Sequence, residues 1–250
     1  MQTINTINQF FSELLMSSPV PDFGYNGIQV ENSGEIKKIA FAVDACEETI
    51  AQAAQLKCNL LAVHHGLFWG KDLPVTGSHY RRLKALLENN IGLLAYHLPL
   101  DGHPEVGNNA QILKKLSAAD LKPCGFHKGF AVGYIGTLQQ PIEVDRIAEI
   151  LNVPNNSLKI LPFGKNKVTK VGVLSGGGGH YFQEFADAGA ELFITGDSEH
   201  VLYHAAKEQN VNVMFAGHYH TEIWGIQALQ RLISEKFSIE TEFISAPTGL

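Results

Sequence analysis

The strongest constraint on the fold is a sequence pattern that occurs twice in the chain. The two copies align without gaps. The segment that starts at Lys37 (KKIAFAVDACEETIAQAAQLKCNLLAVHHG) aligns without a gap with the segment that starts at Thr169 (TKVGVLSGGGGHYFQEFADAGAELFITGDS), and we call the shift from Lys37 to Thr169 the repeat offset. In each copy a short apolar run is followed by a helical stretch and then by a second apolar run. This order is typical of a strand-helix-strand unit. The repeat therefore predicts an α/β fold.

The segments that flank the two copies also resemble each other. A helix-periodic segment precedes each copy, Ile4 to Leu15 in the first and Ile142 to Leu151 in the second. A further helix and strand follow each copy, and these strands end at His97 (IGLLAYH) and at His218 (VNVMFAGH). The similarity therefore extends over most of the chain.

We expect two similar α/β domains from an internal duplication, residues 1–125 and 126–250, with a boundary near Pro123 to Lys128. The 250 residues, of which 45% are hydrophobic, suffice for two cores of ordinary size. No segment with the composition of a linker separates the halves. We therefore expect the domains to pack closely, with a cleft between them.

Composition argues against several functional classes. The net charge of −6, from 25 acidic and 19 basic side chains, disfavours broad capture of nucleic acid. No apolar run reaches the roughly 18 residues that a membrane span needs, and Met1 to Leu15 lacks the features of a signal peptide. Cys46, Cys58 and Cys124 form no CxxC pair, so neither a disulfide framework nor a thiolate zinc site is expected. We expect a cytoplasmic protein without a membrane partner.

Histidines and carboxylates follow three of the predicted strands, at the edge where ligands bind to parallel sheets. His64 and His65 follow NLLAV, His97 and Asp101 follow IGLLAY, and His218 and Glu222 follow VNVMFAG. Imidazole and carboxylate ligands suit zinc, iron, manganese or cobalt better than calcium, so the set predicts a transition-metal site. Gly66 permits a turn that would let two adjacent histidines share that site. For His97 taken alone, a hydrogen-bonded core histidine is an equally good interpretation.

Four further features of the sequence give local expectations. The glycine run SGGGG, which follows a predicted strand, could hold a phosphate or permit close backbone approach. The last helix is expected to begin near Thr221, with His218 in the preceding turn. His200 follows GDSE at the strand end that the repeat equates with HHG, and its role stays open. His79 lies in polar surroundings and is expected at the surface.

Several motifs together resemble one family. They are GIQVE from Gly27, AVHHGLFW from Ala62, HLPLDGHPEVGNNAQIL from His97, SGGGG, TGDSEH and GHYHTE. The chain is similar over nearly its whole length to the NIF-three-like dinuclear-metal-centre family, the GTP cyclohydrolase 1 type 2 homologues. The resemblance implies two divalent transition-metal ions (zinc, iron or manganese) in a cleft between two similar α/β domains. It also implies a ring-shaped homohexamer.

The resemblance also implies a set of ligands. Matched motif by motif, the ligands are His64, His65, Asp101, His218 and Glu222, with Glu222 best suited to bridge both ions. His97 matches as a ligand or as a hydrogen-bond donor to one. The family often has a small residue where this chain has His220, so a rearranged or additional ligand stays open.

The ligand set is compatible with more than one function. A metal pair can activate water, so we expect a metal-dependent hydrolase. Its reaction would resemble that of a GTP cyclohydrolase and would use a small nucleotide as substrate. The same water would serve phosphoester or amide hydrolysis. The alternative is a non-catalytic protein that handles metal or acts as an interaction partner. The sequence assigns no catalytic residue beyond the ligands.

Overall fold

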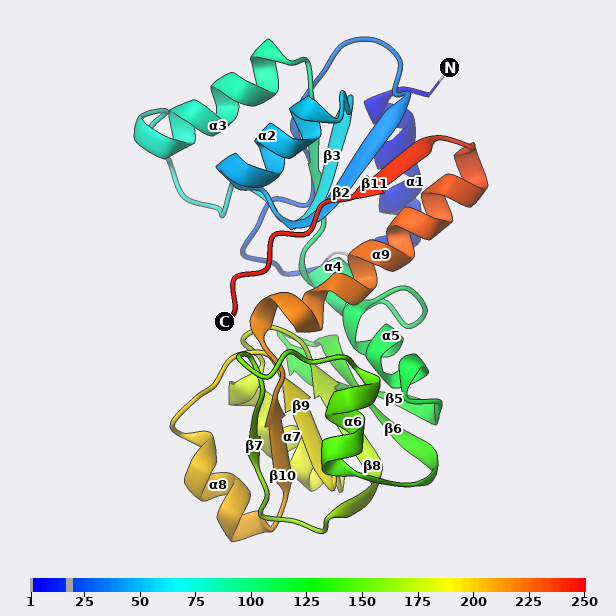
Figure 1. Ribbon diagram of the computed structural model, residues 1–250, viewed down its shortest axis with the longest axis vertical. Helices are drawn as coiled ribbons and strands as arrows, with labels where there is room; N and C mark the ends of the chain where they lie inside the picture. The colour runs from blue at the N-terminus through cyan, green and yellow to red at the C-terminus, as the bar shows by residue number, and fades with distance from the viewer. Residues whose placement is uncertain (1, 17–19) are drawn as a thin grey trace. The chain divides into compact units, whose positions relative to one another are not determined.

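The computed structural model describes residues 2–16 and 20–250, and the chain forms two compact units (Figure 1). Unit 1 contains Met1–Leu100 and Ile226–Ala246, and unit 2 contains Asp101–Gly225 and Pro247–Leu250. The division after Leu100 differs from the predicted boundary near residue 125. Residues 123–128 lie instead in a hairpin of unit 2, where backbone hydrogen bonds join its two strands.

Unit 1 contains a five-stranded sheet in the order β1-β4-β3-β2-β11. Its strands are β1 (Gly27–Val30), β2 (Lys38–Asp44), β3 (Leu60–His65), β4 (Gly92–Ala95) and β11 (Glu240–Phe243). Strand β1 is antiparallel to β4, and the other neighbours are parallel. Helices α2 (Glu47–Gln55) and α3 (Gly77–Glu88) lie on one side of the sheet, and α1 (Ile4–Leu15) lies on the other (Figure 1). Helix α9 (His218–Phe237) crosses from unit 2 into unit 1 after Gly225.

The sequence explains why these elements form. Helix α1 buries Ile4, Ile7, Phe11 and Leu15, whose spacing of three and four residues places them on one helix face. Thr3 caps the helix by accepting a hydrogen bond from the backbone N–H of Thr6. Residues 60–63 of β3 and the whole of β4 are buried and carry no polar side chain, because helices cover both faces of the sheet.

Unit 2 contains a six-stranded sheet in the order β5-β6-β8-β9-β10-β7. Its strands are β5 (Ala118–His127), β6 (Phe130–Glu143), β7 (Lys159–Leu161), β8 (Lys167–Leu174), β9 (Leu192–Thr195) and β10 (Asn212–Phe215). Its helices are α5 (Asn108–Lys115), α6 (Val144–Ile150), a 3-10 turn (Gly179–Tyr181), α7 (Phe182–Asp187) and α8 (Leu202–Gln209); α4 (Leu98–Asp101) ends at the first residue of this unit. Helices α5 and α6 pack on one face of the sheet and α7 on the other (Figure 1).

Four strands have the same order in both units. The series β1-β4-β3-β2 in unit 1 matches β7-β10-β9-β8 in unit 2, with one antiparallel and two parallel neighbours in each. The register matches too, because Ile39 pairs with Leu60 and Val171 pairs with Leu192, and both partners are shifted by the repeat offset. The predicted α/β class and its strand segments are therefore confirmed.

The structure corrects three local expectations. Helix α9 begins at His218, three residues before the predicted start, so His218 and Glu222 lie one turn apart on the same helix. Helix α6 begins only at Val144, because Ile142 still pairs within the sheet. His79 is buried against Phe68 rather than exposed, with ring centroids 5.3 Å apart. Among residues 2–16 and 20–250, no helix has both the length and the hydropathy for a membrane crossing.

Candidate metal centre

Three imidazole rings converge at one edge of the unit 1 sheet. His64 and His65 are the last residues of β3, and His97 follows β4, the neighbouring parallel strand. The ring centroid of His64 lies 4.6 Å from that of His65 and 5.0 Å from that of His97. One ring nitrogen from each lies within 4.8 Å of the others. These three histidines could hold a metal ion.

The Nδ1 atom of each of these histidines contacts an oxygen acceptor. The acceptors are the Tyr96 carbonyl for His64 at 3.0 Å, Asp44 for His65 at 2.9 Å and Asp22 for His97 at 2.7 Å. A carbonyl oxygen only accepts, so Nδ1 of His64 donates this hydrogen bond, and in the neutral ring Nε2 has the lone pair that a metal needs. Carboxylates orient metal-binding histidines in the same way. The three rings therefore share the orientation that metal ligands need.

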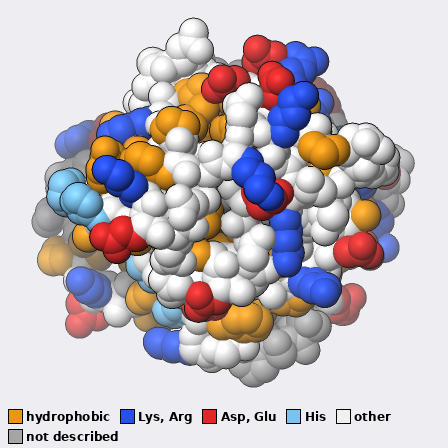
Figure 2. Space-filling model, turned by 90° about the horizontal axis from the view of Figure 1, so that it is seen from below, with side chains coloured by type: hydrophobic (Ala, Val, Ile, Leu, Met, Phe, Trp, Pro, Cys, Tyr) orange, Lys and Arg blue, Asp and Glu red, His pale blue; other side chains and the backbone are white. Residues whose placement is uncertain are grey.

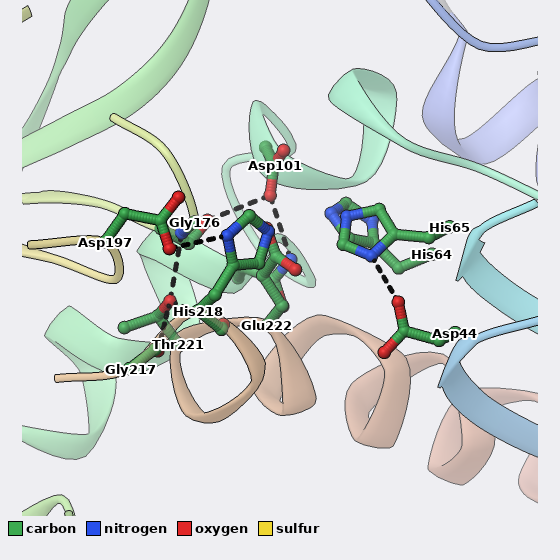
Figure 3. Close-up of polar contacts among 12 residues, drawn as sticks. Asp44, His64, His65, Asp101, Gly176, Asp197, Gly217, His218, Thr221 and Glu222 are labelled. Carbon is green, nitrogen blue, oxygen red and sulfur yellow. Dashed lines mark hydrogen bonds and ion pairs between the residues drawn. The ribbon is translucent and has the colours of Figure 1, made fainter. Parts of the chain in front are cut away.

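The strand register explains the contact between Asp44 and His65. These residues are partners across β2 and β3, the last pair of that ladder (Figure 3). Cross-strand partners lie on the same face of a sheet, so the Asp44 carboxylate meets the imidazole of His65 directly. The carboxyl end of β2 thus supplies a residue to the site that the sequence analysis did not single out.

Asp22 is a buried and extensively hydrogen-bonded carboxylate of unit 1. Its side chain is 3% exposed and accepts hydrogen bonds from the backbone N–H groups of Phe23, Gly24 and Leu98 and from the side chain of Asn26. Burial raises the pKa of Asp22, but the hydrogen bond and charge of His97, with the bonds from Asn26 and Gly24, outweigh it and hold the pKa well below its usual range. Asp22 stays ionised and fixes the ring of His97. No local sequence pattern marks it.

Gly66 has a different role from the predicted one. The two histidines converge although β3 continues through His65, and Gly66 does not have a positive φ. A Cβ atom at Gly66 would collide with the side-chain amide of Gln29. That amide accepts hydrogen bonds from the backbone N–H groups of Leu67 and Phe68 at 2.7 and 3.3 Å. Glycine at this position therefore leaves room for the Gln29 amide and its hydrogen bonds.

In unit 2, His218 and Glu222 lie in the first turns of α9. Nε2 of His218 is 3.2 Å from the Glu222 carboxylate, and its Nδ1 is 2.9 Å from Asp197 (Figure 3). Burial lowers the pKa of His218, but the bonds to Asp197 and Glu222 outweigh it and raise the pKa to about 11. A metal would compete with this proton, because imidazole binds metal only when neutral.

Asp101 is the third candidate ligand of unit 2. Its carboxylate is 5% exposed, and one of its oxygens lies within 4.8 Å of a Glu222 carboxylate oxygen. Asn108 and Ser175 donate hydrogen bonds to Asp101 at 2.9 and 3.0 Å. Asn109 fixes the adjoining backbone, because it donates to the Asp101 carbonyl and accepts from the N–H of Ser175. Two buried carboxylates this close are unfavourable unless cations or hydrogen bonds compensate them.

The glycine run Ser175 to Gly179 is surrounded by carboxylates. A Cβ atom at Gly176, whose φ is +59°, would collide with Glu222, and one at Gly179 would collide with Glu199. A Cβ atom at Gly177 would lie 3.3 Å from Asp197. Three acidic side chains oppose a phosphate at this turn. The surroundings favour close backbone approach, which is the second interpretation of the sequence.

The six predicted ligands are thus divided between the two units. Unit 1 supplies His64, His65 and His97, and unit 2 supplies Asp101, His218 and Glu222. Among the described residues, His200 and His220 belong to no group of metal-binding geometry. His200 lines a pocket of about 260 Å³ with Lys159 and Tyr203. Burial lowers the pKa of His220.

On the face shown in Figure 2, Lys and Arg side chains are separated mostly by uncharged side chains, and Asp and Glu are scattered over the same face. In the lysine-rich segment GKNKVTK, Lys165 lies 3.1 Å from Glu191, and Lys167 lies 3.7 Å from Glu143. These carboxylates offset part of the positive charge of the segment.

Comparisons with known proteins give the family. The sequence profile of the family described as Duf34/NIF3 (NGG1p interacting factor 3) matches residues 2–248. A Pyrococcus abyssi protein named GTP cyclohydrolase 1 type 2 homolog is 45% identical over 246 residues, 98% of each chain. A Deinococcus radiodurans protein of the same name is 39% identical over 97% of this chain and 92% of its own.

Solved structures agree with this match. The crystal structure of TTHA1606 from Thermus thermophilus covers 100% of both chains with a TM-score of 0.89 at 34% identity. The protein ybgI, described as of unknown function, gives a TM-score of 0.91 at 31% identity, again over 100% of both chains. With a profile match across nearly all of its residues, this chain belongs to the Duf34/NIF3 family.

Proposed function

We propose that this protein is a metal-dependent hydrolase with a dinuclear metal centre in a cleft between its two domains. In this proposal His64 and His65 bind from unit 1, and Asp101, His218 and Glu222 bind from unit 2. His97 is a further ligand or a hydrogen-bond donor to one. The ions are divalent transition metals, zinc, iron or manganese, and the substrate is a small nucleotide that reacts as in GTP cyclohydrolase chemistry.

One observation carries the proposal. The three histidines of unit 1 have their Nδ1 atoms on oxygen acceptors, and one nitrogen from each lies within 4.8 Å of the others. A histidine with only a structural role in the core has no need to lie beside two other imidazole rings. Neither group has a thiolate, so the donors suit a metal that keeps a position open for water or substrate.

The donor groups of the two units are complementary. Three neutral imidazoles neutralise no charge of a cation, whereas Asp101 and Glu222 bring two carboxylates. Glu222 is 2% exposed, and as a ligand of both ions it would gain compensation for its burial. The names of the relatives support a nucleotide substrate.

The residues have distinct roles in such a reaction. When bound, the metals supply Lewis acidity, which activates water and stabilises developing negative charge. Asp22, Asp44 and Asp197 hold histidine rings in place through Nδ1. The leaving group needs a proton donor, and His97 or His200 would serve if it is not a ligand.

The test combines metal analysis with turnover. Purified protein should contain close to two transition-metal ions per chain, and His65→Ala or Glu222→Ala should lower that content. His204→Ala is the matched control, because His204 is exposed on α8. Equal metal content in all three variants would refute the ligand assignment.

Turnover separates the two functional alternatives. Metal-loaded protein is incubated with GTP, other nucleotides and generic phosphoesters, with Glu222→Ala as the inactive reference. Metal-dependent turnover that Glu222→Ala abolishes supports the hydrolase. Stoichiometric metal without turnover on the whole panel supports the non-catalytic alternative, a metal-handling or interaction protein.

The proposal also includes the origin, assembly and location of the protein. The matching strand order and the register shared at the repeat offset support an internal duplication. A ring-shaped homohexamer and a cytoplasmic location rest on the family resemblance and on the sequence. Light scattering that shows only monomers would remove the hexamer from the proposal.

A further inference from the structure

We propose that Phe23, Tyr25 and Trp69 form a stacking surface, the aromatic platform, for the planar ring of a purine substrate. This inference rests on the proposed function, because it takes the substrate to be a nucleotide. It adds the part of the protein that would recognise the base, which the ligand residues do not provide.

The three aromatic side chains are unusually accessible. Phe23 is 60% exposed, Tyr25 62% and Trp69 38%. Large aromatic side chains bury most of their surface in folded proteins, and exposed ones mark binding sites when they cluster. Phe23 and Tyr25 lie on the loop before β1, and Trp69 lies on the loop after β3.

The two loops are held together, so the aromatic side chains project from a defined backbone. The N–H of Tyr25 donates to the Phe68 carbonyl at 3.1 Å. Gln29 joins the loops a second time, because its Nε2 donates to the Tyr25 carbonyl while its Oε1 accepts from Leu67. A preorganised surface binds a rigid ligand with a smaller entropic cost.

Asp22 connects the platform to the candidate metal ligands. Its carboxylate accepts from the backbone N–H groups of Phe23 and Gly24 and, on the other side, from Nδ1 of His97. Phe23 is therefore one residue from the group that orients a candidate ligand. A base on the platform would lie beside the donors of unit 1.

Trp69 lies directly against these donors. Its ring centroid is 5.1 Å from that of His97, nearly perpendicular at 83°, and 5.8 Å from that of His65. Its Nε1–H donates to the Gly66 carbonyl at 3.1 Å, so the polar edge of the indole is satisfied. A Cβ atom at Gly24 would approach the indole to 3.2 Å, which shows how closely that backbone packs on it. The indole thus has its N–H bonded and remains 38% exposed.

This chemistry favours a planar heteroaromatic ring. Base stacking on aromatic side chains needs only a π face, and tryptophan and tyrosine are its usual partners. A purine ring fits both the size of a three-residue platform and the nucleotide substrate of the proposed function. A second copy of this chain, which could also cover apolar side chains, is an outcome that the test distinguishes.

The experiment measures binding of guanosine, which has the base and the sugar but no phosphate for the metals. Titration calorimetry is done on zinc-loaded and on metal-stripped protein. Trp69→Ala should weaken guanosine binding about ten-fold, and Phe23→Ala and Tyr25→Ala by several-fold. Trp69→Phe should retain most of the affinity, because it keeps an aromatic face.

Tyr80→Ala is the matched control, since Tyr80 is 49% exposed on α3 and outside the platform. Metal content is measured on every variant, so loss of the platform is distinguished from loss of the metal. Guanosine affinity that Trp69→Ala leaves unchanged overturns the platform. A change in oligomeric state alone, found by light scattering, also overturns it and assigns these side chains to a contact between copies.

The two proposals fail separately. Metal bound at the expected ratio without guanosine binding removes the platform and leaves the metal centre. Guanosine binding that the Trp69→Ala variant loses, in a protein that takes up no metal, supports the platform and removes the hydrolase.

Discussion

Asn59 in unit 1 and Glu191 in unit 2 stand at equivalent positions of the repeat and make the same contacts. The Asn59 side chain accepts hydrogen bonds from the N–H groups of Lys37 and Lys38, and the Glu191 side chain accepts from those of Thr169 and Lys170. The two pairs of donors are equivalent in the repeat as well. In both units, therefore, one side chain binds two backbone N–H groups of the neighbouring strand, although the side chain is an amide in unit 1 and a carboxylate in unit 2.

The carboxyl ends of the same strands differ in chemistry. Asp44 and His65 pair at the end of β2 and β3, and their equivalents in the second copy of the repeat are Gly176 and Asp197. Asp44 orients an imidazole, whereas Gly176 leaves space for the side chain of Glu222. In unit 1 the strand ends supply the donors, and in unit 2 a glycine makes room for donors from a helix. One backbone arrangement therefore carries two different sets of candidate ligands.

The largest effect should come from substitutions at equivalent buried positions in the two sheets. Leu60 and Leu192 are fully buried at matching positions, so each Leu→Ala substitution should lower the free energy of unfolding by about 2–5 kcal/mol. Chemical denaturation measures both. The units are alike in packing if the two losses agree within about 2 kcal/mol, the spread found for Leu→Ala substitutions at buried sites. A negligible loss at one position breaks the comparison.

The second prediction concerns the carboxylate that only unit 1 has at this position. Asp44→Ala should weaken metal binding roughly 10- to 100-fold, because the ring of His65 loses its orienting partner. Competition with a fluorescent chelator measures the affinity. Glu48→Ala is the control, since Glu48 is exposed on α2. An unchanged affinity in Asp44→Ala would show that His65 needs no such partner.

The third prediction concerns the glycine that unit 2 has instead. Gly176→Ala should cost about 1–2 kcal/mol for the left-handed backbone alone, and its Cβ atom would also displace Glu222. Gly34→Ala isolates the backbone effect, because Gly34 has a φ of +91° and no atom within 4 Å of an added Cβ. Thermal unfolding gives the stability, and metal content should fall in Gly176→Ala only. Equal stability and equal metal content in the two variants would contradict the idea that Gly176 leaves space for Glu222.

The smallest effect should be the acid sensitivity of the Glu191 contact. The backbone N–H of Thr169 lowers the pKa of Glu191 most; burial opposes this, and Lys165 and Lys170 add to the lowering. Because the pKa of Glu191 is lower in the folded protein than its ordinary value of 4.5, the ionised side chain stabilises the fold above pH 4.5. This stabilisation is lost as the pH falls through the folded pKa. Below that pH the wild type should lose less than about 1 kcal/mol of its free energy of unfolding through this contact. The Glu191→Gln variant should not show that loss.

Asn59→Asp should introduce the same acid sensitivity into unit 1, because a carboxylate replaces an amide that accepts two N–H groups. Denaturation at a series of pH values measures both variants. A stability curve of Glu191→Gln that still parallels the wild type below pH 4.5 would mean that other carboxylates govern the acid limb.

The sequence by itself determined the local elements and the ligand candidates. Apolar runs of strand length and the repeat offset identified β2, β3, β8 and β9, since buried parallel strands must be apolar along their length. The position of polar side chains directly after these strands singled out the six donors. Both inferences need only residue order and the geometry of a covered sheet.

Only the tertiary structure decided which residues orient those donors. Asp22 is 75 residues from His97, and Asp197 is 21 residues from His218, so no local pattern joins them. The division after Leu100 and the β5-β6 hairpin were missed for a related reason. Strand pairing depends on hydrogen bonds between distant backbone segments, and the return of β11 to β2 depends on a helix that passes from one unit to the other. Residue order limits such contacts but does not select them, because packing of the whole chain determines which partners meet.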